Sequence, residues 1–167
     1  QIQVGEFFDA ADFVPVTHAH IMADTESLGE AGVALLERLA ALPDRRVRVP
    51  TITDPRGLDF AVYKRLGQTD AMAALEARTI AAFRAFGVLM TDTCINYQTI
   101  LPPTFGEHLA MGDTGVVIYS NSVFGARSNF EGGPSALAAD LTGRTPRYGY
   151  HLDEARRATH RFRVTSP

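Results

Sequence analysis

The sequence predicts an α/β fold with three layers, in which helices flank a mostly parallel sheet. Short apolar runs rich in β-branched residues alternate with longer segments whose apolar residues recur at helical spacing. Polar residues follow several predicted strands, and ligands of parallel sheets bind outside the carboxyl ends of the strands. The 167 residues are enough for one core, so a single α/β portion over residues 1–167 is expected.

The first clear strand is predicted over residues 13–17 and leads into His18 and His20. Two histidines one residue apart project to the same side of an extended strand, which suits a pair of metal ligands. Zinc needs three or four ligands, and no nearby carboxylate or third histidine completes the set. A structural role for both histidines is therefore the alternative.

Two amphipathic helices are predicted next. The Ser-Leu-Gly-Glu sequence at 27–30 matches a capping box, and leucines then recur at helical spacing until Pro43. Thr69 is predicted to cap the second helix, and Gly87 suits the position just after its end. The apolar face of this second helix comprises Met72, Leu75, Ile80, Phe83 and Phe86.

Short strands are also predicted at 47–51 and 88–91. Arg48 and Arg56 are expected to be solvated or salt-bridged and not to be substrate ligands. Cys94 lies just beyond the second of these strands. A lone cysteine is usually a small buried hydrophobic residue. The polar loop around Cys94, at 92–97, favours a ligand role instead.

A second capping-box pattern, at 104–107, predicts a short helix that continues to Met111. In this interpretation the carboxylate of Glu107 binds the backbone at the start of the helix. Proton transfer is the alternative role for Glu107, and His108 beside it is open to the same two interpretations.

The longest polar stretch covers residues 120–135, after a strand predicted at 116–119 and before a short predicted helix. Gly132-Gly133 would let an anion approach free backbone N–H groups at the helix start. Arg127 can bind a carboxylate or phosphate through two parallel hydrogen bonds. Further polar groups for a substrate are those of Ser122, Asn129 and Ser135. A solvated loop that only forms tight turns is the alternative.

A fifth strand is predicted at 148–151 and ends in His151. Polar residues would then lie at the ends of successive strands, at 17–20, 93–96, 120–129 and His151. Because the carboxyl ends of parallel strands meet at one edge of a sheet, we expect these residues to form a single site.

The composition excludes several classes of protein. A net charge of -3, with acidic and basic residues interspersed, gives no indication of a nucleic-acid partner. No apolar run is long enough to span a bilayer, and the first residues lack the pattern of a secretory signal. One cysteine excludes an internal disulfide framework and fits a reducing compartment. We therefore expect a cytoplasmic protein without a membrane partner.

The stretch Asn-Ser-Val-Phe-Gly-Ala-Arg-Ser-Asn-Phe-Glu-Gly-Gly-Pro-Ser-Ala-Leu-Ala-Ala, at 121–139, closely resembles the signature of the aconitase X family, a branch of the aconitase superfamily. The resemblance continues through 141–146 and includes segments at 14–21, 48–51, 91–94 and 106–108. It implies an aconitase-like sheet that is incomplete in this chain, because the large chain of the family is longer. The swivelling small domain of aconitases is expected to be absent.

The resemblance also implies an iron or iron-sulfur centre with Cys94 as a ligand. Aconitase-type dehydratases hold this centre with several cysteines, so further ligands are expected from outside this chain. They would come from the remainder of the enzyme or from a small subunit. The same resemblance places His20 in the active site.

The implied activity is that of a hydro-lyase, which removes water from a small hydroxy acid. Known branches imply two substrates: cis-3-hydroxy-L-proline, which gives Δ1-pyrroline-2-carboxylate, and mevalonate 5-phosphate. Many relatives have Thr-Pro where this chain has Ile95-Asn96, and this difference favours hydroxyproline.

The expected roles follow from that chemistry. Arg127 and Gly132-Gly133 would bind the carboxylate, and candidates for proton transfer are His20, Glu107 and His108. The groups expected to orient the substrate are Asn96, Ser122 and Asn129.

Two functions of other classes are the alternatives. One is a non-catalytic regulatory or assembly subunit that retains the fold. The other is a nucleotide-binding module, although no Gly-rich loop has Walker or dinucleotide spacing.

Overall fold

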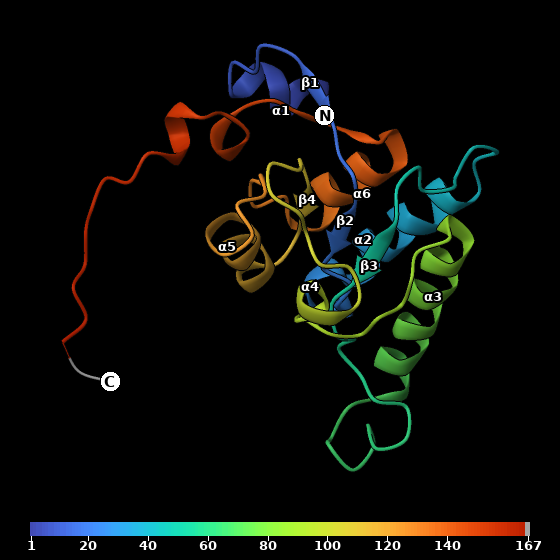
Figure 1. Ribbon diagram of the computed structural model, residues 1–167. Helices are drawn as coiled ribbons and strands as arrows, with labels where there is room; N and C mark the ends of the chain where they lie inside the picture. Colours follow the sequence, from blue (N-terminus) through green and yellow to red (C-terminus); the bar gives the residue numbers. More distant parts are fainter. Residues whose placement is uncertain (166–167) are drawn as a thin grey trace.

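The computed structural model describes residues 1–165 and confirms the α/β class (Figure 1). In chain order the elements are α1 (Ile2–Phe7), β1 (Phe13–Pro15), β2 (Ala19–Ile21), α2 (Thr25–Ala40), β3 (Thr51–Thr53), α3 (Asp70–Phe86), α4 (Asn96–Thr99), β4 (Ala110–Met111), α5 (Thr114–Ser122), α6 (Gly132–Thr142), β5 (Arg144–Pro146), and the 3₁₀ helices η1 (Gly149–His151) and η2 (Glu154–Arg156). Within residues 1–165, no helix has both the length and the apolar character needed to cross a bilayer.

A parallel sheet lies at the centre of the molecule, with strand order β3-β2-β4. His20 in the middle strand pairs with Ile52 on one side and Met111 on the other. Single parallel bridges extend this sheet at both edges; they join Ile52 to Leu89, Met111 to Phe130 and His108 to Arg127. β1 and β5 form a separate antiparallel pair.

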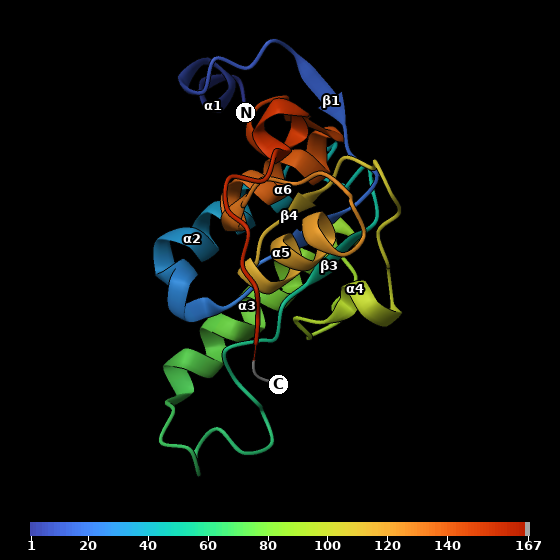
Figure 2. The ribbon, with the colours of Figure 1, turned by 60° about the vertical axis from the view of Figure 1, so that its left-hand side comes forward.

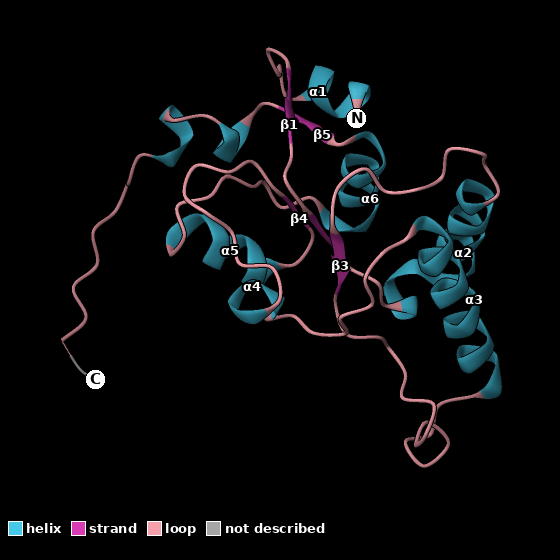
Figure 3. Ribbon diagram, turned by 45° about the vertical axis from the view of Figure 1, so that its right-hand side comes forward, coloured by secondary structure: helices cyan, strands magenta, loops and turns pink. Residues whose placement is uncertain are grey.

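Helices cover both faces of the parallel sheet. α2 and α3 pack on each other, and together with α6 they bury one face. α4 and α5 lie on the other side of the sheet (Figures 1 and 3), and the view in Figure 2 again separates α2 and α3 from α4. The predicted three-layer arrangement is therefore confirmed.

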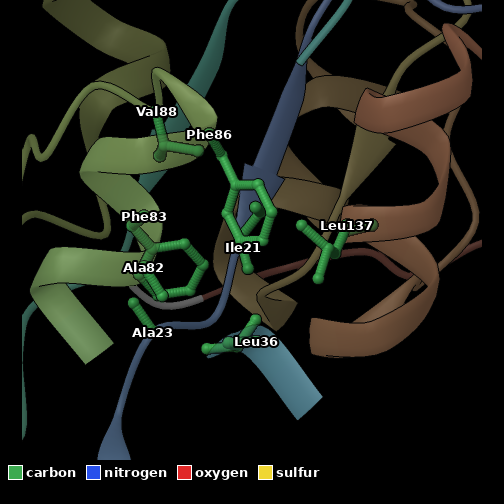
Figure 4. Close-up of a cluster of buried hydrophobic side chains, with 9 residues drawn as sticks. Ile21, Ala23, Leu36, Ala82, Phe83, Phe86, Val88 and Leu137 are labelled. Atoms are coloured by element: carbon green, nitrogen blue, oxygen red, sulfur yellow. The ribbon is translucent and has the colours of Figure 1, made fainter. Parts of the chain in front are cut away.

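The main apolar cluster forms on the α2–α3–α6 face, around Ile21 of β2 (Figure 4). Phe83 and Phe86 of α3 lie beside Ile21 and are 1% and 0% exposed. Leu36 of α2 and Leu137 of α6 close the cluster from the other helices. A second cluster, between the sheet and the α4–α5 layer, fixes the opposite face; it comprises Tyr97, Leu109, Met111, Val116, Val117 and Ala126.

The ends of the two long helices, α2 and α3, test the capping residues predicted from the sequence. The hydroxyl oxygen of Thr69 accepts a hydrogen bond from the N–H of Met72 at 3.2 Å, and Gly87 follows α3 with φ 82°, so both predictions are confirmed. α2 instead begins after Asp24, whose carboxylate accepts from the N–H of Ser27 at 2.7 Å. The predicted capping box at 27–30 therefore lies inside α2, at a kink where Gly29 has φ 56°.

Three predicted elements are wrong. Residues 116–119 lie in α5, not in a strand, because Asp113 caps a helix there and its carboxylate accepts from the N–H of Gly115 at 3.1 Å. Residues 108–111 are extended and include β4, so the helix predicted after the second capping box does not form. Residues 148–151 contain the 3₁₀ helix η1, and the last strand is β5.

The other strands are shorter than predicted or displaced. β3 starts where the strand predicted at 47–51 ends. The segment 88–91 contributes only the bridge at Leu89, and β1 covers the first half of 13–17. A strand or bridge nevertheless lies in or next to each of these three segments, so the predicted order of the strands along the chain is preserved.

Candidate metal and substrate site

Three potential metal ligands converge at the carboxyl edge of the parallel sheet. Asp54 directly follows β3, Asp113 follows β4 by two residues, and Cys94 precedes α4. One oxygen of each carboxylate and the sulfur of Cys94 lie within 4.8 Å of one another. Within residues 1–165, this is the one group of three His, Cys, Asp or Glu side chains with such spacing, and we call it the metal group.

The ring of His20 lies next to Asp54 of the metal group. Its side chain is fully buried, and Nε2 lies 3.2 Å from Oδ1 of Asp54. This approach lacks the alignment of a hydrogen bond, so both ring nitrogens and Oδ1 have no hydrogen-bond partner among the described residues. An unpaired buried polar atom costs about 1–3 kcal/mol. A ligand bound at this place would remove that cost.

The donor set defines which metal would fit. Partial burial and the carboxylates of Asp54 and Asp113 raise the pKa of Cys94 to about 11, so the thiol stays protonated at neutral pH unless a cation offsets the negative charges. One sulfur and two carboxylates suit a single iron or similar divalent ion. An iron-sulfur cluster is usually held by several thiolates, and this chain has one cysteine. The residues present therefore fit one metal ion or one part of a larger centre.

Asn96 fixes the loop that carries Cys94. Its Nδ2 donates to the carbonyl of Thr93 at 3.0 Å, and its buried Oδ1 has no partner among the described residues. The hydroxyl of Thr91 donates to the carbonyl of Thr53 at 2.8 Å, which ties the start of this loop to β3. Cys94 and Asp54 are held together by these bonds.

The start of α6 lies at the same edge of the sheet. A Cβ added at Gly112 would lie 2.6 Å from the carbonyl oxygen of His20 and 3.0 Å from that of Gly132, so only glycine permits this close approach. Gly132 itself has φ 60°, in the left-handed region that favours glycine. The structure thus brings the predicted residues Gly132 and Gly133 to the edge that carries His20, Cys94 and Asn96.

Other predicted residues lie at the opposite end of the sheet. His108 precedes β4, and its Nδ1 lies 2.9 Å from Nδ1 of His151. Arg127, which pairs with His108, donates to the carbonyl of His151 at 3.1 Å and forms an ion pair with Asp153. Between His108 and Asp113 an extended chain spans roughly 16 Å. The expectation that all strand-end polar residues share one site is therefore wrong.

The side chain of Glu107 has the backbone role that one interpretation gave it. Its carboxylate accepts a hydrogen bond from the N–H of Thr104 at 2.7 Å.

Burial and the neighbouring His151 lower the pKa of His108. Burial also lowers the pKa of His18 to about 4, so this ring is neutral near pH 7. Neither His18 nor His20 is a member of the metal group. The two histidines therefore do not form the metal-binding pair that their spacing suggested.

The remaining predicted substrate ligands bind the protein's own backbone or solvent. Nδ2 of Asn129 donates to the carbonyl of Tyr148 at 3.1 Å, and its Oδ1 accepts from the N–H of Tyr150 at 2.8 Å. The hydroxyl of Ser135 donates to the carbonyl of Glu131 in the first turn of α6. Ser122 is exposed at the end of α5.

Sequence reasoning missed both carboxylates of the metal group. Asp54 belongs to an Asp-Pro-Arg-Gly sequence, which is typical of a turn and does not by itself indicate a metal ligand. Asp113 was placed ahead of a predicted strand, whereas it follows β4 and caps α5. The available signal was that each is the first acidic residue after a short buried strand, and correct strand positions would have revealed it.

Comparisons with known proteins agree with this architecture. Residues 2–154 match the family described as aconitase X first domain. The chain is 38% identical, over 95% of its length, to the phosphomevalonate dehydratase large subunit of Methanocaldococcus jannaschii, and it spans 40% of that protein. It is 32% identical to the cis-3-hydroxy-L-proline dehydratase of Pseudomonas aeruginosa, over 89% of this chain and 25% of that protein.

A solved structure shows the same fold. The crystal structure of Thermococcus kodakaraensis aconitase X in its holo-form superposes with a TM-score of 0.85 at 33% sequence identity. The superposition covers 95% of this chain and 39% of that one. With the match to residues 2–154, this likeness shows that the chain belongs to the aconitase X family.

Proposed function

We propose that this chain forms one wall of the active site of a metal-dependent hydro-lyase that removes water from a small hydroxy acid. The observation that carries the proposal is the convergence of Asp54, Cys94 and Asp113 beside the buried ring of His20. The relatives named above are dehydratases, and the chain spans about two fifths or less of their length. The remainder of the protein, or a small subunit, would complete the site, since one of these relatives is named as a large subunit.

Removal of water requires a base for a carbon-bound proton and an acid for the departing hydroxyl. The metal group would hold iron, alone or in a cluster with further cysteines from outside this chain, and iron supplies a Lewis acid for the hydroxyl oxygen. His20 keeps Asp54 in place for this task. The N–H groups at Gly132 and Gly133 would donate to the substrate's carboxylate, because the start of a helix favours an anion.

Proton transfer remains assigned to three candidates. His20 is the one that lies beside the metal group, and Glu107 and His108 lie at the other end of the sheet. Their roles remain predictions, as does substrate binding by Asn96, Ser122, Asn129 and Ser135. For Arg127 the prediction requires the substrate to replace Asp153 at the guanidinium, and Arg127→Lys would then raise KM.

Two substrates are supported by different observations. Identity is higher to the phosphomevalonate dehydratase large subunits than to the cis-3-hydroxy-L-proline dehydratases, which favours mevalonate 5-phosphate. The Ile95-Asn96 sequence favours cis-3-hydroxy-L-proline. Both substrates are hydroxy acids with a carboxylate, so the same wall of the site can serve either.

The test is a dehydratase assay of the complete, iron-loaded assembly with each substrate in turn, followed by product identification. Turnover of one substrate supports the proposal and identifies the branch. Absence of turnover with both, in a preparation with no visible absorbance from iron, would instead favour the regulatory or assembly role.

A further inference from the structure

The loop that carries Asp54 of the metal group also carries a cation. Arg56 follows Asp54 by two residues, and its Nη2 lies 2.7 Å from Oδ2 of Asp92. Asp92 in turn precedes Cys94 by two residues. The two loops that supply Asp54 and Cys94 are therefore joined by this ion pair.

Arg56 is the one lysine or arginine in the segments that follow the strands at this edge of the sheet. Each of these segments also contains an acidic residue. The segments are 22–25, 54–57, 91–96, 112–113 and 131–133. Repulsion from these carboxylates would disfavour an anionic substrate unless a cation meets it. Arg127, the anchor expected from the sequence, lies at the opposite end of the sheet, where it pairs with His108.

The ion pair borders an open hollow with room for a small ligand. The hollow has a volume of about 630 Å³ and is lined by Pro55, Arg56, Leu58, Asp59, Phe60, Ala61 and Asp92. Arg56 is the one cationic group of this lining, beside two carboxylates and several apolar side chains, so an anionic end of a small acid would be bound at its guanidinium.

Stability alone gives a poor account of this pair. The side chains of Arg56 and Asp92 are 34% and 28% exposed, and ion pairs as exposed as this one contribute little to stability. Asp92 has φ 51°, which is costly for a residue other than glycine, and its buried Oδ1 has no partner among the described residues. Beyond this pair, no hydrogen bond within residues 1–165 uses the other guanidinium donors. Such strain and unused donors are common where a ligand binds.

We propose that Arg56 binds the anionic group of the substrate, a carboxylate or a phosphate, in the hollow that it lines with Asp92, and that Asp92 positions the guanidinium. This inference rests on the proposed dehydratase function. It adds Arg56 to the anion-binding groups that the sequence alone placed at Arg127, Gly132 and Gly133.

The test compares Arg56→Lys and Arg56→Gln with wild type in the complete, iron-loaded enzyme. Lysine keeps the charge but loses the paired donors, so KM should rise about 10- to 100-fold in Arg56→Lys and further in Arg56→Gln. Bound iron and the melting temperature should not change. The matched control is Arg78→Lys, because Arg78 also pairs with carboxylates, Glu30 and Glu37, but does so between α2 and α3.

Direct binding measurements identify the anion and do not depend on turnover. Inorganic phosphate and acetate are titrated separately into wild type and Arg56→Lys by calorimetry. Weaker binding of phosphate in the variant assigns a phosphate contact, and weaker binding of acetate assigns a carboxylate contact. Equal binding of both anions, or a rise in KM that is matched by loss of iron, would overturn the role of Arg56. Wild-type enzyme that turns over neither substrate would refute the dehydratase function, while the titrations would still decide the role of Arg56.

Discussion

Nε2 of His20 lies 3.2 Å from Oδ1 of Asp54, and the two residues come from neighbouring strands of the parallel sheet. The register pairs His20 with Ile52, and side chains two residues apart project from the same face of a strand. Asp54 therefore extends from the face that carries His20, where the buried ring limits its movement. The position of one metal ligand is thus fixed by the sheet itself.

Replacing His20 should loosen that ligand. In His20→Ala the carboxylate of Asp54 gains freedom, and loss of a residue that positions a ligand typically lowers metal affinity about 10- to 100-fold. The measurement is a titration of the complete protein with iron under anaerobic conditions. The same affinity in wild type and variant would show that His20 does not position Asp54. His20→Gln, which fills more of the space, separates a loss of packing from a loss of positioning.

Cys94→Ser should release iron without unfolding the protein. The thiol is exposed, so its replacement removes little packing, whereas serine is a much poorer ligand for iron. Bound iron and circular dichroism are measured on the same sample of the complete enzyme. If iron occupancy stays the same, Cys94 is not a ligand. A loss of both iron and folded protein would favour a structural role for this cysteine.

Asp140 in α6 should make the protein less stable as pH rises. Burial raises the pKa of this carboxyl from 3.8 to about 8, so between these values the folded state retains a proton that the unfolded chain releases. Stability therefore falls as pH rises through this window and stays low above it. Asp140→Asn cannot titrate, so it should raise the free energy of unfolding by roughly 1–3 kcal/mol at pH 8 and by less at pH 5.

Thermal melts at the two pH values provide the measurement for Asp140. The control is Asp44→Asn, because Asp44 is exposed before β3. A gain for Asp140→Asn that is the same at pH 5 and pH 8 would contradict the titration of this carboxyl.

The apolar cluster around Ile21 should dominate the stability of the fold. Phe86 is fully buried in it, and Phe86→Ala is expected to cost about 3–5 kcal/mol through lost burial and the cavity that remains. Leu42→Ala is the control, since Leu42 is 53% exposed. Equal midpoints of urea unfolding for the two variants would show that this cluster is not the principal core.

Residues 1–167 alone should not catalyse dehydration. Their one cysteine cannot supply the several thiolates that usually hold a cluster, and the relatives that act as dehydratases are longer. The isolated segment, reconstituted with iron and sulfide and checked for folding by circular dichroism, is assayed beside the complete assembly. Comparable turnover by the segment would require a complete site within it, with ligands sought among its histidines.

The sequence determined the features that depend on local signals. Thr69 and Gly87 mark the ends of α3 because a capping hydroxyl and a left-handed glycine act on their immediate neighbours. The signature at 121–139 identified the family for the same reason, since it is a contiguous run of residues. Cys94 was likewise placed at the carboxyl edge of the sheet by its position after the extended segment 88–91. Gly132 and Gly133 lie at the same edge although the strand predicted ahead of them, at 116–119, is helical.

Only the tertiary structure decided the short elements and the composition of the site. An apolar run of four residues, such as 116–119, fits a buried strand and a buried helix equally well, and the packing of Val116 and Val117 in the α4–α5 layer selects the helix. Once 116–119 is helical, the polar stretch after it runs back to the other end of the sheet, and Arg127 moves away from Cys94. Asp54 and Asp113 meet because strands far apart in the sequence pair in a particular register, which no local signal specifies.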